Sequence, residues 1–224
     1  MVLAYNIPNK LGEIMNKYFQ TLNQIPIHPI ITKMRDIAYR QQVPIINDEG
    51  LVFLLFLVKT IKAKRILEIG TAIGFSAIHM ALVDEAIHVE TIERDPVLVE
   101  QAITHIREAN LTSQITLIHE DALLLEVQQL KGNYDIIFID AAKAQYQKFF
   151  TKYAPLLATS GIIVSDNLLF HGLVGGEKEI ESKNLRHLVG KIDTFNKWLT
   201  SNPDYDTTFL AIGDGMAVST RCKR

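Results

Sequence analysis

The chain has 224 residues, of which 48% are hydrophobic, and this length and composition fit one compact α/β domain with a helical extension. Its formal net charge of -2 excludes a strongly basic protein that coats nucleic acid, although a local basic patch would still allow an RNA substrate. The only cysteine, Cys222, excludes an intrachain disulfide and a cysteine-rich zinc site, so a reducing cytoplasm is the expected location. The most apolar run, Leu51 to Val58, is too short to span a bilayer, and no membrane association is expected.

Residues 1–62 are predicted to form a helical extension and cap. Apolar residues recur at helical spacing from Leu11 to Leu22. A second helix is expected over Ile30 to Gln41, ending before Pro44. A third begins near Asp48, an acid suited to a helix N-terminus, and runs to about Ile61.

Residues 63–224 are predicted to form a Rossmann-like core, because short apolar β-type runs alternate with amphipathic stretches. The predicted strands are Arg65–Ile69, His88–Ile92, Ile115–His119, Tyr134–Ile139 and Gly161–Ser165. The predicted helices between them are Ser76–Leu82, Pro96–Ala109, Ala122–Leu130 and Tyr146–Leu157. Such alternation implies a parallel sheet with helices on both faces, which binds ligands at the carboxyl ends of its strands.

The C-terminal part departs from this alternation. A helix near Leu185–Leu199 is followed by the β-type runs Tyr205–Ile212 and Met216–Thr220. The turn Gly213-Asp214-Gly215 joins these two runs, as in a hairpin. We therefore expect an antiparallel strand pair at the end of the sheet.

A glycine loop follows the first predicted strand. Gly70 and Gly74 allow a sharp turn from strand to helix and leave backbone exposed to a ligand. Their spacing matches neither the G-x-G-x-x-G pattern of nicotinamide sites nor the Walker phosphate loop. Glu68, just before the loop, either faces the cofactor or organises the turn.

Two further acids lie at the ends of the next strands. Glu93 suits the vicinal hydroxyls of a ribose, and its position one βα unit after the glycine loop favours this reading over a solvated strand end. Asp121 could accept from an adenine amino group or cap the helix that follows. Together these features favour S-adenosylmethionine over NAD, because no pyrophosphate site is required.

The tips of the fourth and fifth strands carry Asp140, Asp166 and Asn167. In a parallel sheet these tips lie at the same edge, so the two carboxylates and the amide would form an oxygen-rich site of the kind that Mg²⁺ prefers. Each Asp alone could be a turn residue, and Lys143 alone could be a solvated charge. Their coincidence on adjacent tips favours a metal site with a nearby lysine.

These motifs resemble those of the class I, metal-dependent O-methyltransferases of the catechol and caffeoyl-CoA type, over nearly the whole chain. The residues that carry the resemblance are Leu67-Glu68-Ile69-Gly70 with Gly74 and Ser76, Ile92-Glu93, Asp121-Ala122, Asp140-Ala141-Ala142-Lys143 and Asp166-Asn167. The resemblance implies a class I methyltransferase Rossmann-like sheet of about seven strands, mostly parallel with the last strand antiparallel, in a homodimer.

The resemblance also implies roles for individual residues. S-adenosylmethionine would contact Ile46, Glu68, Gly70, Ser76, Glu93, Asp121, Ala122 and Asp140. Mg²⁺ or another divalent cation would be held by Asp140, Asp166 and Asn167, and Lys143 would be the catalytic residue.

Within the family, the chain is most similar to a bacterial branch that methylates the 5-hydroxyuridine of the tRNA wobble position to 5-methoxyuridine. The similarity lies in Val43-Pro44-Ile45, Gly70 to Ser76, Asp140 to Tyr146, and Asp166 to Gly172. Plant enzymes usually carry an acid where this chain has Ala142. The tRNA anticodon stem-loop is therefore the first expected partner.

In the expected reaction, a bound Mg²⁺ lowers the pKa of an acceptor hydroxyl that has a second oxygen beside it. Lys143 takes the proton or steadies the oxyanion. Two alternatives remain: a small catechol or phenol as the acceptor, and a nucleoside-binding α/β protein that transfers no methyl group.

Overall fold

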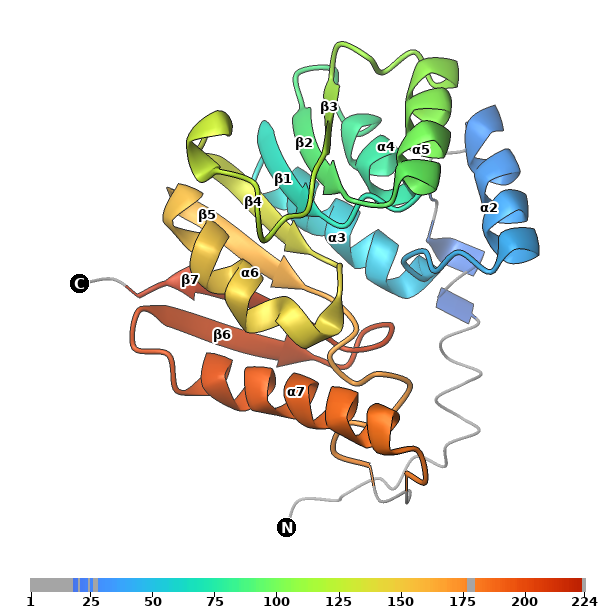
Figure 1. The fold of residues 1–224 in the computed structure, drawn as a ribbon. Helices are drawn as coiled ribbons and strands as arrows, with labels where there is room; N and C mark the ends of the chain where they lie inside the picture. Colours follow the sequence, from blue (N-terminus) through green and yellow to red (C-terminus); the bar gives the residue numbers. More distant parts are fainter. Residues whose placement is uncertain (1–17, 20, 24, 26–27, 177–179, 223–224) are drawn as a thin grey trace.

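The computed structural model describes residues 18–19, 21–23, 25, 28–176 and 180–222 of the chain. A seven-stranded sheet lies at the centre, in the order β3-β2-β1-β4-β5-β7-β6 (Figure 1). Its strands are β1 (Arg65–Ile69), β2 (His88–Glu93), β3 (Ile115–His119), β4 (Tyr134–Ile139), β5 (Leu157–Ser165), β6 (Tyr205–Leu210) and β7 (Met216–Arg221). The predicted Rossmann-like sheet is confirmed.

Six strands of the sheet run in one direction, and β7 alone runs in the opposite direction. β5 pairs with β7 in antiparallel register, with Ser165 opposite Ala217, and β7 pairs with β6 in the same sense. The hairpin predicted from the Gly213-Asp214-Gly215 turn is thus confirmed. Since β7 runs against β5, the start of β7 lies beside the end of β5, and the turn lies at the edge of the sheet where β4 and β5 end.

Six α-helices surround the sheet in the described part of the chain: α2 (Pro29–Gln41), α3 (Asp48–Thr60), α4 (Phe75–Ala81), α5 (Pro96–Glu108), α6 (Tyr146–Tyr153) and α7 (Lys183–Thr200). Helices α3 and α5 each begin at a residue whose side chain accepts a hydrogen bond from the first turn. Asn47 Oδ1 accepts from Gly50 N at 2.9 Å at the start of α3, and Asp95 Oδ1 accepts from Val97 N at 2.8 Å at the start of α5. No described helix has the length together with the apolar composition that crossing a bilayer demands.

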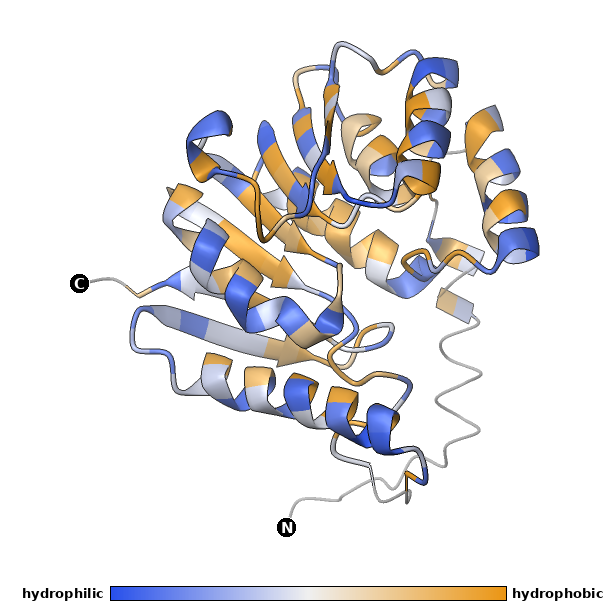
Figure 2. Ribbon diagram, viewed as in Figure 1, coloured by the Kyte–Doolittle hydropathy of each residue, from blue (hydrophilic) through white to orange (hydrophobic). Residues whose placement is uncertain are grey.

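The central strands β1 and β4 are buried on both faces, as a mainly parallel sheet requires. Ile66 and Ile136 contribute to the core shared with α2, α3, α4 and α5. Their neighbours Leu67 and Ile137 contribute to the core shared with α6 and α7. Figure 2 shows long hydrophobic stretches in β1, β4, β5 and α3, while α5 and α7 alternate between hydrophobic and hydrophilic residues.

One predicted helix is wrong. Ala122–Leu130 forms turns and a short 3-10 segment at Val127–Gln129 instead of an α-helix. Tyr153 Oη donates to the carbonyl of Ala122 at 2.6 Å, and Lys152 Nζ donates to that of Leu123 at 2.7 Å. Side chains of α6 therefore satisfy carbonyls that a helix would have used.

Several element boundaries also differ from the prediction. The β5 strand begins at Leu157 rather than Gly161, because the exposed Thr159 and Ser160 hide its apolar pattern. The α6 helix ends at Tyr153, where Ala154–Leu156 continues as a 3-10 turn. The helix predicted from Leu11 to Leu22 lies largely outside the described residues.

Candidate active site

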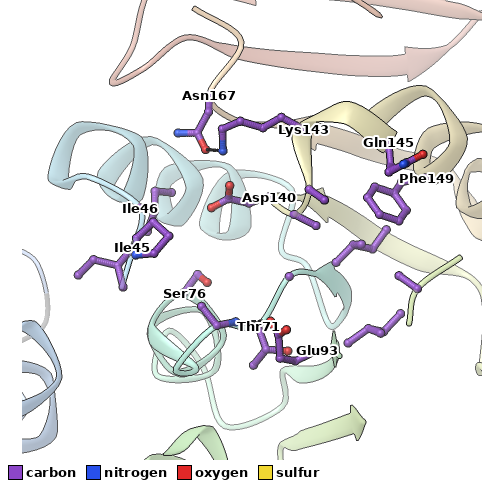
Figure 3. A pocket seen from close by; sticks show the side chains of 18 of the residues that line it. Ile45, Ile46, Thr71, Ser76, Glu93, Asp140, Lys143, Gln145, Phe149 and Asn167 are labelled. Carbon is purple, nitrogen blue, oxygen red and sulfur yellow. Dashed lines mark hydrogen bonds between the residues drawn. The ribbon is translucent and has the colours of Figure 1, made fainter. Parts of the chain in front are cut away.

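A cavity of about 1040 Å³ opens at the carboxyl ends of β1, β2, β4 and β5. The predicted residues that line it are Ile46, Gly70, Ser76, Glu93, Asp121, Ala122, Asp140, Lys143 and Asn167. Glu68 and Asp166 are wholly buried and do not line it. In Figure 3, Lys143 and Asn167 point toward each other across one end of the cavity, Asp140 lies between them and the glycine loop, and Ser76 and Glu93 lie at the other end.

The glycine loop approaches the tip of β4 very closely. Gly70 has φ +103°, and a Cβ added there would lie 2.2 Å from the backbone oxygen of Asp140. A side chain at this position would therefore be strained in conformation and would clash with backbone. This contact joins the two halves of the predicted site, since Gly70 belongs to the cofactor loop and Asp140 to the metal cluster.

Glu68 lies beneath the loop. Its Oε1 accepts from the Ser76 hydroxyl in α4, and its Oε2 accepts from the Thr91 hydroxyl in β2. Burial raises the pKa of Glu68 to about 8. Of the two interpretations left open by the sequence, these contacts support the one in which Glu68 organises the loop.

Glu93 and Asp121 both line the cavity, although backbone amides occupy part of each carboxylate. Glu93 Oε2 accepts from Ala72 N at 2.9 Å, which ties β2 to the glycine loop. Asp121 Oδ1 accepts from Leu123 N at 2.8 Å and so caps a turn instead of the predicted helix, while its Oδ2 pairs with Arg94 at 3.3 Å. Carboxylates held in this way are placed to accept from hydroxyl or amino groups of a ligand.

The predicted metal cluster is brought together at the tips of β4 and β5. Lys143 Nζ donates to Asn167 Oδ1 at 2.7 Å, and Asp166 Oδ1 accepts from Asn167 N at 2.6 Å. Burial raises the pKa of Asp140, against the lowering effect of the Lys143 ammonium. Burial and the nearby Asp140 carboxylate raise the pKa of Asp166 as well.

The residues of this cluster fit a hard divalent cation. Asp166 Oδ2 is buried without a hydrogen-bond partner among the described residues. The described part of the chain has no group of three carboxylate, imidazole or thiol side chains arranged for a metal, so such a site depends on the Asn167 amide. Two carboxylates and an amide form an all-oxygen donor set, and a cation would offset the unfavourable proximity of the two acids.

The sequence profile of the O-methyltransferase family matches residues 23–222. The chain belongs to the O-methyltransferase family. A caffeoyl-CoA O-methyltransferase of Populus kitakamiensis is 30% identical over 99% of both chains. A flavonoid 3',5'-methyltransferase of Vitis vinifera is 29% identical over 78% of this chain and 77% of its own.

Solved structures agree with this family. One is a crystal structure from Staphylococcus aureus, described as that of a "putative caffeoyl-CoA O-methyltransferase". It is 38% identical, has a TM-score of 0.87, and the match covers 93% of this chain and 100% of that chain. An O-methyltransferase of Bacillus cereus in complex with SAH has 25% identity and a TM-score of 0.78, over 93% of this chain and 97% of that one.

Some residues in the cavity of this O-methyltransferase were not predicted as site residues. Asp214 lines the cavity, and its side chain is only 13% exposed, yet sequence analysis assigned it only to a hairpin turn. Gln145 and Phe149 also line it, from the segment that follows Lys143. Their spacing of four residues at the start of α6 is the signal that would have placed both on one face near the β4 tip.

Proposed function

We propose that this chain transfers the methyl group of S-adenosylmethionine to a phenolic hydroxyl that has a second oxygen beside it, with a divalent cation at Asp140, Asp166 and Asn167. The observation that carries the proposal is that Asp140, Lys143 and Asn167 share one cavity with the glycine loop and Glu93. Cofactor and acceptor groups would thus meet at the β4 tip, where proximity supplies much of the rate enhancement.

The cofactor half of the proposal assigns the ribose to Glu93 and the adenine amino group to Asp121, with the methionine part along the loop from Gly70 to Ser76. Ile46 and Ala122, which both line the cavity, would supply apolar contacts. The Bacillus cereus relative binds SAH, the product of this cofactor. The glycine spacing, which supplies no pyrophosphate site, agrees with a nucleoside of this kind.

A divalent cation, when bound, lowers the pKa of the acceptor hydroxyl and thereby favours its attacking form. Asp140, Asp166 and Asn167 would hold the ion. The acceptor oxygen forms a bond to the methyl carbon while the bond from that carbon to sulfur breaks, which leaves S-adenosylhomocysteine and a methyl ether. Lys143 Nζ, which donates to Asn167 Oδ1 at 2.7 Å, lies beside this cluster, and in its neutral amine form it would receive the hydroxyl proton and become an ammonium.

We favour a small phenolic acceptor over tRNA because basic residues of α2 are already paired with acids. Lys33 contacts Glu108 at 2.7 Å, and Arg35 contacts Asp48 at 2.5 Å. Neutralised pairs of this kind provide little attraction for a phosphate backbone. The named plant relatives also carry small phenolic substrates in their names.

The tRNA wobble 5-hydroxyuridine remains the second candidate, on the strength of the residues that resemble the bacterial branch, from Asp140 to Tyr146 and from Asp166 to Gly172. Its O5 and O4 offer the same pair of neighbouring oxygens as a catechol. The cluster would thus select the pair of neighbouring oxygens that both acceptors have, and it would not by itself distinguish one acceptor from the other.

The deciding experiment measures methyl transfer from labelled S-adenosylmethionine to three acceptors: caffeic acid, its 4-hydroxy analogue that lacks the second hydroxyl, and tRNA that contains 5-hydroxyuridine. We expect transfer to caffeic acid, none to the mono-hydroxy analogue, and loss of transfer with EDTA that Mg²⁺ restores. Transfer to the tRNA alone would replace the small-molecule proposal with the tRNA one. Equal transfer to both phenols, insensitive to EDTA, would refute the role of the cation.

Three further predictions belong to the same proposal. First, the chain forms one O-methyltransferase domain, with a helical extension over residues 1–62 and a core over residues 63–224. Second, the protein is a homodimer, and third, it is located in the cytoplasm. Sedimentation velocity tests the dimer, limited proteolysis tests the division of the chain, and cell fractionation tests the location.

A further inference from the structure

The turn between β6 and β7 holds the loop that follows β5. Asp214 O accepts from Leu169 N at 2.8 Å, and Gly215 O accepts from Leu168 N at 2.9 Å. The side chain adds a third bond, because Asp214 Oδ1 accepts from His171 N at 2.6 Å. The segment Asn167–His171, called here the Asn167 loop, is therefore joined to the turn at three successive points.

The close approach of the two segments depends on glycine. Gly215 has φ +84°, and a Cβ added there would lie 2.9 Å from Leu169 N and 2.5 Å from Leu169 Cγ. Any side chain at this position would therefore push the Asn167 loop away from the turn. Gly215 thus allows the turn to approach closely enough for Asp214 to reach His171.

The Asn167 loop has an unfavourable backbone conformation. Asn167 has φ +59°, Phe170 has φ +47° and His171 has φ +57°. Left-handed values are uncommon for residues other than glycine, above all for bulky ones such as phenylalanine. Such residues hold their conformation only where surrounding contacts impose it, and the bonds to Asp214 and Gly215 are such contacts.

The Asp214 carboxylate is also electrically part of the cluster. Its Oδ2 is buried without a hydrogen-bond partner among the described residues and lies 3.7 Å from His171 Nδ1, and the side chain lines the cavity. Its charge acts on Asp166 and on Tyr146, whose hydroxyl donates to Asp166 O at 3.0 Å. Asp214 therefore holds the loop through Oδ1, while its charge acts on the neighbouring Asp166.

We propose that Asp214 is a positioning residue that, through its bond to His171 N, keeps the Asn167 loop in the conformation that presents the Asn167 amide to the cation site. The inference rests on the proposed function only in taking that amide as a cation ligand. Loss of the bond would free the loop to relax from its left-handed conformation and move Asn167 Oδ1 away from Lys143 and Asp166. The β5 tip itself, paired with β7 and β4, would stay in place.

The test uses the full chain and three variants: Asp214→Ala, Asp214→Asn and Asp206→Ala. Asp214→Asn keeps an acceptor oxygen for His171 N and removes the charge. Asp206 is an exposed acid on β6, so its replacement is the matched control. Two quantities are measured for each: hydrogen exchange of the Leu168 and Leu169 amides without metal, and Mg²⁺ affinity by calorimetry with S-adenosylhomocysteine bound.

We expect Asp214→Ala to speed exchange of both amides by about fivefold or more, as loss of one ordinary hydrogen bond would. These two amides donate to backbone carbonyls that the substitution leaves in place, so faster exchange reports motion of the loop. We expect Mg²⁺ affinity to fall by about tenfold or more, as for other groups that orient metal ligands. Asp214→Asn should keep both quantities within about threefold of the unaltered protein, and Asp206→Ala should change neither.

Two results would overturn the inference: exchange in Asp214→Ala that equals that of the unaltered protein, or exchange and affinity in Asp214→Asn that match Asp214→Ala. The second result would mean that charge, and not the bond to His171, is what counts. If the unaltered protein binds no Mg²⁺ while Asp214→Ala still loosens the loop, the proposed cation fails and the positioning role of Asp214 stands.

Discussion

Asp166 has a cost to the stability of the fold that the proposed cation would offset. It is wholly buried, its Oδ2 has no hydrogen-bond partner among the described residues, and burial together with Asp140 raises its pKa. A buried polar atom left unpaired lowers stability unless something binds it. Sequence analysis could select Asp166 because it follows a β-type run, but its burial depends on neighbours brought in from β4 and β7.

We predict that Asp166→Asn loses Mg²⁺-stimulated methyl transfer by about a hundredfold or more, because the amide offers a cation no charge. Without metal, the free energy of unfolding at pH 8 should be no lower than that of the unaltered protein, since a costly buried acid is removed. Kinetics over a Mg²⁺ titration and urea denaturation measure the two quantities. Unchanged Mg²⁺-dependent turnover would remove Asp166 from the site.

We predict that Lys143→Met lowers kcat by about 10² to 10⁴, the usual contribution of a general acid or base. Affinity for S-adenosylhomocysteine should stay within about threefold, since the cofactor residues lie toward the other end of the cavity. Lys148→Met is the control, because Lys148 is an exposed lysine in α6. Equal kcat values for the two variants would exclude Lys143 from proton transfer.

At the scale of elements, Glu68 joins three of them beneath the cofactor loop. It belongs to β1 and accepts hydrogen bonds from Ser76 in α4 and Thr91 in β2. The local sequence predicted a strand, a glycine turn and a helix, but it left the role of Glu68 open. The reason is that its second partner, Thr91, lies 23 positions away and meets it only across the paired strands β1 and β2.

Glu68 should make stability depend on pH. Its pKa is about 8 in the folded protein against an ordinary value of 4.5, so the folded state retains the proton longer. The stability that this protonated form contributes is full below pH 4.5 and is lost as pH rises through 8. The loss would reach at most about 1.4 kcal/mol for each pH unit within that window.

We therefore predict that Glu68→Gln, which cannot lose a proton, is less sensitive to pH than the unaltered protein. Its free energy of unfolding, relative to that of the unaltered protein, should rise from pH 5 to pH 8. Urea denaturation at several pH values measures this difference, with Glu85→Gln as an exposed control. A difference that does not change with pH would show that Glu68 is already ionised when folded.

At the scale of the whole molecule, one sheet edge collects residues from distant parts of the chain. Ile46 precedes α3, Glu93 ends β2, Lys143 follows β4 and Asp214 precedes β7, and all line the same cavity. Occupation of that cavity by a cofactor should therefore stabilise the folded protein as a unit, because the unfolded chain has no such site.

We predict that S-adenosylhomocysteine at about 100 times its Kd raises the free energy of unfolding by about 2.7 kcal/mol. NAD at the same concentration should have no effect, since the glycine loop lacks the pyrophosphate pattern. Thermal denaturation with each ligand tests this. Stabilisation by NAD alone would favour the nucleoside-binding alternative without methyl transfer.

The sequence by itself determined the order of strands and helices, the hairpin at Gly213–Gly215 and the residues at the strand tips, because these depend on local periodicity and on turn residues. Tertiary structure decided which of those residues meet. It replaced the predicted helix at Ala122–Leu130 with turns, because Lys152 and Tyr153 take up its carbonyls. It also brought Asp214 to the Asn167 loop, because β7 runs antiparallel between β5 and β6. Contacts of this kind join residues far apart in the chain, so they cannot be predicted from local sequence patterns.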